Sequence, residues 1–254
     1  LDGATGEAAA RFLAFEPGYA GGAYVAAADF NGDGFADIVV TPDEGGGARV
    51  RVFDGRGGAT LADFLGIEDA NFRGGARVAA GDVNGDGVPD LLVGAGFGGG
   101  PRLAVFDGRG LRPGPAPPKL FPDFFVFEPA LRNGVYLAAG DLDGDGADDL
   151  VIGGGPGGGP RVFALSGRAL AESGGGARVQ LANFFAGDPS RRGGVRVAAK
   201  DLDGDGRAEV IAGGGEPAPV VNVYAGADIP PDGAPATDAQ FRAFADAVGG
   251  IFVG

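Results

Sequence analysis

Apolar and polar residues alternate along short stretches of this chain, as in RVRVF at residues 49–53. Such alternation is typical of half-buried antiparallel strands. No segment of ten or more residues shows a convincing helical period, and Gly-rich turns separate the apolar runs. The pattern therefore predicts an all-β protein.

One pattern of strand-like segments occurs four times. Each copy contains an approach strand, an acidic loop, an apolar run, a Gly-rich turn and two further strand-like segments. The acidic loops begin at Asp29, Asp82, Asp141 and Asp201, which are 53, 59 and 60 residues apart. Four strands per repeat of this length are typical of the four-stranded antiparallel blade of a β-propeller, whereas the coils of an open solenoid are usually shorter. We expect complete repeats at approximately 23–75, 76–133, 134–193 and 194–248.

Partial repeats stand at both ends of the chain. Residues 1–22 match the end of a third strand and a fourth strand, and GGIFVG at 249–254 matches a first strand. We expect residues 1–254 to form a single propeller domain or a propeller segment, cut or processed from a longer protein. An unpaired apolar strand would be prone to aggregation. The C-terminal strand should therefore pair with the segment around Phe12–Phe15 or with a second molecule, which predicts self-association through the terminal strands.

The acidic loop has the donors of a calcium site. Positions 1, 3, 5 and 9 of the four copies hold 14 carboxylates and two Asn side chains, and Gly stands at position 6. Hard oxygen donors at odd spacings, with a backbone carbonyl at position 7, suit Ca²⁺ better than Mg²⁺, which prefers a smaller octahedral site. Without a cation the carboxylates would repel one another. The predicted ligands of about four Ca²⁺ ions are Asp29, Asn31, Asp33, Phe35 and Asp37; Asp82, Asn84, Asp86, Val88 and Asp90; Asp141, Asp143, Asp145, Ala147 and Asp149; and Asp201, Asp203, Asp205, Arg207 and Glu209.

Two other interpretations of the loop fit less well. An EF-hand needs a bidentate Glu at position 12 and flanking helices. Position 12 is instead an apolar residue inside an expected strand: Val40, Val93, Ile152 or Ala212. Asx-turns that only cap hairpins would explain the turn, but not the presence of every donor in all four copies.

The loop closely resembles the calcium-binding loop of FG-GAP repeats, also called VCBS-type repeats, which occur in the propeller of integrin α subunits. The resemblance rests on the first strand, D-x-[DN]-x-D-G-x-x-[DE], the apolar second strand and the Gly-rich turn, and it covers nearly the whole chain. GG or NG replaces Phe-Gly, and GAG or GGGP replaces Gly-Ala-Pro. The resemblance implies a calcium-binding propeller, while these departures argue against transferring integrin-like ligand binding.

Composition excludes several kinds of chemistry. Cys and His are absent, which rules out disulfides, thiolate or imidazole catalysis, and zinc sites of the usual ligand types. The net charge of −14 argues against nucleic acid as a partner, and four Ca²⁺ ions would change it to −6. No apolar run is long enough to insert into a membrane.

Several weaker signals have simpler explanations. GAGFGG at 94–99 matches a dinucleotide fingerprint, but a strand follows it instead of a helix. Recurring arginines could line a ring for acidic ligands, but are expected to form inter-blade salt bridges or to be solvated; they are Arg49, Arg102, Arg161, Arg56 and Arg109. A recurring aromatic patch could stack sugars, but is expected to form the inter-blade core; it includes Phe12, Phe15, Phe64, Phe124, Phe125, Phe127, Phe184, Phe185, Phe241 and Phe244.

The acids beside the aromatic patch follow the repeat, whereas a catalytic pair should break it, so we expect no catalytic residues and no enzyme activity in this chain. The sequence favours a secreted or cell-surface, calcium-stabilised module for adhesion or for binding a protein or glycan. Two alternatives stay open: a scaffold or accessory domain of a polysaccharide-active enzyme, and a structural subunit of a surface layer or filament.

Overall fold

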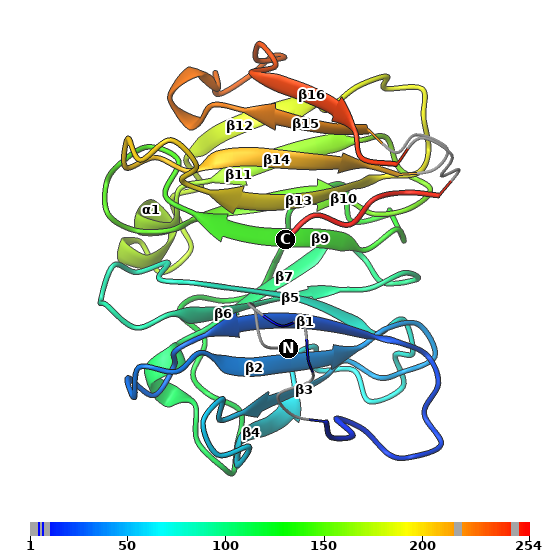
Figure 1. Cartoon of the computed structure of the whole chain (residues 1–254), viewed down its shortest axis with the longest axis vertical. Helices are drawn as coiled ribbons and strands as arrows, with labels where there is room; N and C mark the ends of the chain where they lie inside the picture. Colours follow the sequence, from blue (N-terminus) through cyan, green and yellow to red (C-terminus); the bar gives the residue numbers. More distant parts are fainter. Residues whose placement is uncertain (1–4, 6, 8–10, 216–219, 245–248) are drawn as a thin grey trace.

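The computed structural model describes residues 5, 7, 11–215, 220–244 and 249–254. These residues form four antiparallel sheets of four strands each, and within each sheet the strands are adjacent in chain order (Figure 1). The first sheet contains β1 (Ala23–Ala28), β2 (Asp37–Pro42), β3 (Arg49–Phe53) and β4 (Thr60–Leu65). The second contains β5 (Ala76–Gly81), β6 (Asp90–Ala95), β7 (Arg102–Phe106) and β8 (Phe124–Phe125). The third contains β9 (Val135–Gly140), β10 (Asp149–Gly154), β11 (Arg161–Leu165) and β12 (Gln180–Phe185), and the fourth contains β13 (Val195–Lys200), β14 (Glu209–Gly214), β15 (Val220–Tyr224) and β16 (Ala239–Arg242).

The predicted all-β fold is confirmed, and the described residues contain three short helical exceptions. These are the 3-10 turns η1 (Gly108–Gly110) and η2 (Gly226–Asp228), and α1 (Gly167–Glu172). The helix α1 begins after Ser166, whose hydroxyl accepts a hydrogen bond from the Ala169 N–H. Six residues are too few to give a periodic sequence signal, so the pattern of apolar residues did not indicate it. In the described part of the chain, no helix has the length and apolar character to cross a membrane.

The core lies between consecutive sheets. Three clusters of buried residues join the first sheet to the second, the second to the third, and the third to the fourth. Phe64 of β4 meets Phe106 of β7 with ring centroids 5.0 Å apart, and Phe184 of β12 meets Tyr224 of β15 at 4.8 Å. Each sheet therefore buries its apolar side chains against its neighbour.

The expectation that the whole aromatic patch is buried is only partly correct. In the Phe-Phe pair of β12, Phe184 is 4% exposed and Phe185 is 45% exposed. Phe124 and Phe125 of β8 divide in the same way, at 6% and 45%. Successive side chains of a strand point to opposite faces, so only the first ring of each pair reaches the core.

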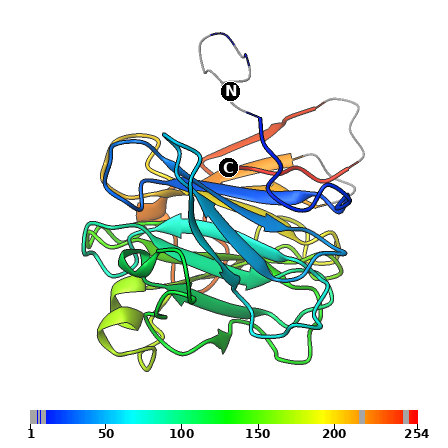
Figure 2. The same ribbon diagram turned by 90° about the horizontal axis from the view of Figure 1, so that it is seen from below.

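The first strands of the four sheets surround one cavity. Residues of β1, β5, β9 and β13 line it together with Phe252, Val253 and Gly254, and its volume is about 920 Å³. The Ile251 N–H donates to the Gly214 carbonyl at 3.0 Å, and the Phe252 ring lies 6.1 Å from the Tyr24 ring. Figure 2 shows this red C-terminal segment close to the blue strand β1.

The C-terminal segment thus lies beside the fourth sheet, at the end of β14. The Ile251 N–H bonds Gly214 of that sheet, whereas we predicted that this segment would pair with the segment around Phe12–Phe15. The N-terminal segment instead packs on the first sheet, where the Phe12 ring lies 5.0 Å from Phe53 and Glu16 pairs with Arg49 at 2.9 Å. Pairing with a second molecule stays a prediction.

Candidate metal centres in four acidic loops

Each acidic loop closes the hairpin between the first and second strands of a sheet. The residue before the loop pairs with the acid at position 9, as in Ala28 with Asp37 and Gly140 with Asp149. The ladder therefore fixes both ends of every loop. All four loops occupy the same place in their sheets, so their donors can be compared position by position.

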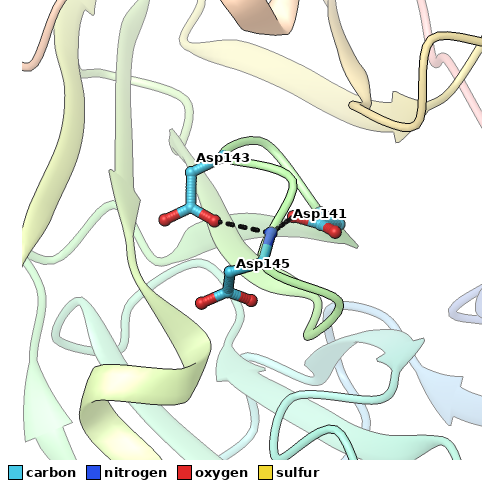
Figure 3. A group of neighbouring side chains, drawn as sticks. All are labelled: Asp141, Asp143 and Asp145. Atoms are coloured by element: carbon cyan, nitrogen blue, oxygen red, sulfur yellow. Dashed lines mark hydrogen bonds between the residues drawn. The ribbon is translucent and has the colours of Figure 1, made fainter.

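The third loop brings three carboxylates together (Figure 3). One oxygen from each of Asp141, Asp143 and Asp145 lies within 4.8 Å of the others. Asp141 accepts the N–H groups of Gly144 at 2.7 Å and Gly146 at 2.8 Å, and both Asp141 and Asp143 accept the Asp145 N–H. These backbone donors hold the side chains with their oxygens facing one another.

The position-1 acid organises the other loops in the same way. Its carboxylate accepts the N–H of the glycine at position 6, at 2.8 Å in Asp29, 2.7 Å in Asp82 and 3.1 Å in Asp201. That glycine has a left-handed φ in every loop, a conformation that side-chain-bearing residues avoid. The angles are +86° at Gly34, +87° at Gly87, +85° at Gly146 and +87° at Gly206. The residue at position 7 donates its N–H to the position-5 acid. The carbonyl oxygen of the position-7 residue is the predicted backbone ligand of the cation.

The fourth loop gathers a different trio. Asp201, Asp203 and Glu209 each place a carboxylate oxygen within 4.8 Å of the other two. Glu209 is longer than the Asp found at this position in the other loops, and it still accepts the Leu202 N–H at 2.7 Å. In this loop the structure therefore groups position 9 with positions 1 and 3, whereas in the third loop it groups position 5 with them.

The acid at position 9 has a structural role that the sequence did not reveal. Asp149 is 0% exposed, and its two carboxylate oxygens accept the N–H groups of Leu142 at 2.8 Å and Gly167 at 3.1 Å. Asp37 and Asp90 are bonded in the same way. Burial raises the pKa of Asp90 and of Asp149 to about 7. This acid therefore ties the loop to the turn after the third strand, in addition to any part in metal binding.

The turn after the third strand needs glycine for this contact. Gly55, Gly108 and Gly167 follow β3, β7 and β11, and each donates its N–H to the position-9 acid of its own sheet. A Cβ on any of them would collide with the carbonyl oxygen of loop position 8. The recurring Asp-Gly-Arg and Ser-Gly-Arg sequences are explained in part by this close approach.

Two arginines from the same turns reach acids that are predicted metal ligands. The Arg168 Nε lies 3.1 Å from the Asp145 Oδ2, and its Nη2 donates to the Asp145 carbonyl at 2.7 Å. Arg109 makes the same two contacts with Asp86, at the same distances. Arg109 was expected to bridge blades or to be solvated; its side chain is 56% exposed, and it pairs within its own sheet instead of between blades. The contact joins residues 23 positions apart, which is why no local pattern indicated it.

The third-strand arginines form the ion pairs that the sequence predicted, but not only between blades. Arg161 reaches Glu128 from the preceding repeat at 3.7 Å, whereas Arg49 also pairs with Asp63 of its own sheet at 2.6 Å. The side-chain hydrogen bond and charge of Arg49 lower the pKa of Asp63. These arginines are therefore neutralised by carboxylates and belong to the structural framework.

The donor set fits a hard divalent cation. All side-chain donors are carboxylate or amide oxygens, the type that Ca²⁺ prefers. Burial, and to a smaller extent the charges of Asp145 and Asp141, raises the pKa of Asp143. Arg168, which pairs with Asp145, and Arg207, whose charge acts on Asp143, compensate part of the negative charge of this loop. A bound cation would compensate the rest.

Comparison with known proteins agrees with the loop geometry. Residues 29–93, which contain the first two loops, match the FG-GAP-like repeat family. This part of the chain is therefore similar to FG-GAP-like repeats. The chain is 32% identical over 142 residues to integrin alpha-7 of Rattus norvegicus and to integrin alpha-7 of Homo sapiens, and the match covers 51% of this chain.

The chain spans only 12% of the length of these integrins. Among solved structures it is similar in fold to a rhamnogalacturonan lyase of Bacillus licheniformis, with a TM-score of 0.50 and 18% sequence identity. That similarity covers 75% of this chain and 40% of the lyase chain. At this identity the likeness concerns the fold alone.

Proposed function

We propose that this chain is a calcium-stabilised β-propeller module that binds a protein or glycan ligand outside the cell. One observation carries the calcium proposal: four loops hold oxygen donors at the same sequence positions, and in the third and fourth loops three carboxylates lie within 4.8 Å of one another. Calcium is structural in this proposal, because it would hold the hairpin between the first and second strands of each sheet. No residue of the loops is assigned a catalytic role.

The propeller is proposed from the packing of the sheets. Four first strands and the C-terminal segment line one cavity. The N-terminal ring of Phe12 meets Phe53 of β3 as Phe64 of β4 meets Phe106 of β7, both at 5.0 Å. The two ends would therefore supply the first and fourth strands of one further blade.

The location is proposed from the similarity to integrin alpha-7 and from the proposed calcium sites. Calcium sites of moderate affinity suit the millimolar calcium found outside cells. We propose adhesion or ligand binding, and no enzyme activity, because the acids beside the aromatic patch follow the repeat; they are Glu16, Glu68, Glu128 and Asp188.

Calorimetric titration of the chelated protein tests this proposal. We expect about four calcium ions, and a higher melting temperature with calcium than with chelator, because a ligand that binds only the folded state stabilises it. Asp145→Ala and Asp205→Ala should each remove one ion. A titration without binding at millimolar calcium would refute the calcium proposal.

A second candidate is a scaffold or accessory domain of a polysaccharide-active enzyme. It is favoured by the fold likeness to a rhamnogalacturonan lyase. Binding on a glycan array without release of shorter products would support the binding module. Product release that is lost on mutation of an acid outside the repeat pattern would support the enzyme.

A further inference from the structure

The first strands carry an alternating set of aromatic and arginine side chains at one equivalent position. In each case the residue stands two positions after a glycine, in the sequences GAY, GAR, GVY, GVR and GIF. The five residues are Tyr24, Arg77, Tyr136, Arg196 and Phe252, and all of them line the central cavity. The acidic loops begin five residues further along the four strands, about 16 Å away at the usual rise of a strand. This set is therefore distinct from the calcium loops.

The five side chains contact one another. The Arg77 guanidinium lies 4.0 Å from the ring centroid of Tyr136 and 5.6 Å from that of Tyr24. The Arg196 guanidinium lies 4.9 Å from Tyr136 and 4.8 Å from Phe252. The Tyr24 and Tyr136 rings lie 6.1 Å and 6.0 Å from the Phe252 ring. Two cations thus share one cluster of three aromatic rings.

Neither cation has a carboxylate partner within 4.0 Å among the described residues. Arg77 is only 3% exposed, and its Nη1 donates to the Val135 carbonyl at 3.3 Å. Arg196 donates from Nη1 to the Gly193 carbonyl at 3.1 Å. The Nε atom of each is buried and has no hydrogen-bond partner in the part of the chain that the structure describes. By contrast, Arg49, Arg102 and Arg161 all pair with carboxylates.

An uncompensated cation in a buried position is costly, and stacking on aromatic rings offsets only part of that cost. The chain has 34 acidic residues against 20 basic ones, so acidic partners are abundant elsewhere. Asp43 also lines the cavity, but it lies beyond ion-pair distance of both arginines. Burial raises the pKa of Tyr136 to about 12, so its hydroxyl stays neutral and supplies no negative charge. The described lining of the cavity thus includes two guanidinium groups without a carboxylate partner, in a protein with a net charge of −14.

We propose that the central cavity binds a small carboxylate-bearing ligand, whose carboxylate pairs with Arg77 and Arg196 and whose carbon skeleton packs on Tyr24 and Phe252. Guanidinium groups suit carboxylates because they donate in a planar fork. The volume of about 920 Å³ lies within the range of small-molecule sites. Phe252 is 61% exposed and offers an accessible ring face. The inference deepens the proposed binding function by naming the ligand chemistry, and it does not depend on the metal.

The test is a calorimetric titration of the calcium-loaded protein, freed of excess calcium, with glucuronate, glucose and glutarate. Glucuronate and glucose differ at one carboxylate, so their comparison isolates the charge. Glutarate carries carboxylates without a sugar ring. The variants are Arg77→Lys and Arg196→Met, with Arg132→Met as the control, because Arg132 is an exposed arginine that bonds the backbone of its own turn. Thermal melts establish that each variant is folded before titration.

We expect saturable binding of glucuronate, no binding of glucose at the same concentration, and binding about tenfold or more weaker in Arg196→Met, with no change in Arg132→Met. If glutarate binds as well, a carboxylate is sufficient for binding. If glutarate does not bind, the site requires a carboxylate on a sugar ring. If Arg77→Lys does not fold, Arg196→Met alone decides. Absence of glucuronate binding, equal binding of glucose, or unchanged affinity in Arg196→Met would overturn the inference. If the same samples still bind the normal number of calcium ions, the calcium proposal stands although the cavity proposal fails. Loss of glucuronate binding in Arg196→Met would show that glucuronate does not bind through calcium in the loops.

Discussion

Arg168 should weaken calcium binding at the third loop. Its Nε lies 3.1 Å from the Asp145 Oδ2, so a cation that takes this carboxylate must weaken the ion pair. We therefore predict that Arg168→Gln, which keeps a neutral donor for the Asp145 carbonyl, tightens calcium binding there. The number of carboxylates in the loop does not predict tighter binding, because Arg168→Gln leaves Asp145 and the other loop acids unchanged.

The size of the effect follows from the exposure of the pair. The side chains of Arg168 and Asp145 are 36% and 28% exposed, and partly exposed ion pairs contribute about 0.2–1 kcal/mol. Removing the pair should therefore make the binding free energy more favourable by up to about 1 kcal/mol, which is about a fivefold lower Kd. The effect should diminish as salt rises, because the charges are then screened.

The assay must separate one loop from the others. The amide signals of Gly146 and Gly206 report on the third and fourth loops by NMR during a calcium titration. Ala227 stands where Arg168 stands in the third sheet, so the Gly206 signal is an internal control. We expect a lower calcium midpoint for Gly146 and an unchanged one for Gly206. An unchanged or higher midpoint for Gly146 would refute the competition between Arg168 and the cation.

Three further predictions concern stability. Asp149→Ala should lower the free energy of unfolding by about 2–4 kcal/mol, measured with urea, because it leaves two buried N–H groups without acceptors; a loss below 0.5 kcal/mol would contradict this role. Deleting residues 249–254 should lower the melting temperature or abolish assembly, and unchanged values of both would show that the segment is dispensable. Asp205→Ala should destabilise the calcium-loaded protein more than Asp33→Ala, because the fourth loop has four carboxylates and the first has three; equal melting temperatures would argue against ligand charge as the determinant.

The sequence predicted those features that are local and repeated. The sheets follow from alternation, and the loop turns follow from Asp and Gly at fixed spacing, as Asp141 and Gly146 illustrate. The position-9 acids were predicted as ligands, and that role stays a prediction. Their bonds to Gly55, Gly108 and Gly167 depend on where the third strand returns, which spacing along the chain does not fix.

Contacts between distant segments were the features that escaped prediction. Arg168 was not singled out at all, because its pairing with Asp145 requires the turn after β11 to lie beside the loop. The alternation of Tyr24, Arg77, Tyr136, Arg196 and Phe252 is visible in the aligned repeats, yet it gains meaning only once the first strands line a common cavity. Phe125 and Phe185 were assigned to the core with their neighbours, although the period of a strand places them on the opposite face.

The most direct test of the account is the number of calcium ions bound by the chelated protein, measured by calorimetric titration together with thermal melts in calcium and in chelator. We predict about four bound ions and a melting temperature that is higher in calcium than in chelator. The difference between the two melting temperatures should be largest at low salt, where repulsion among the loop carboxylates is least screened. No binding at millimolar calcium, or coincident melts, would contradict the account.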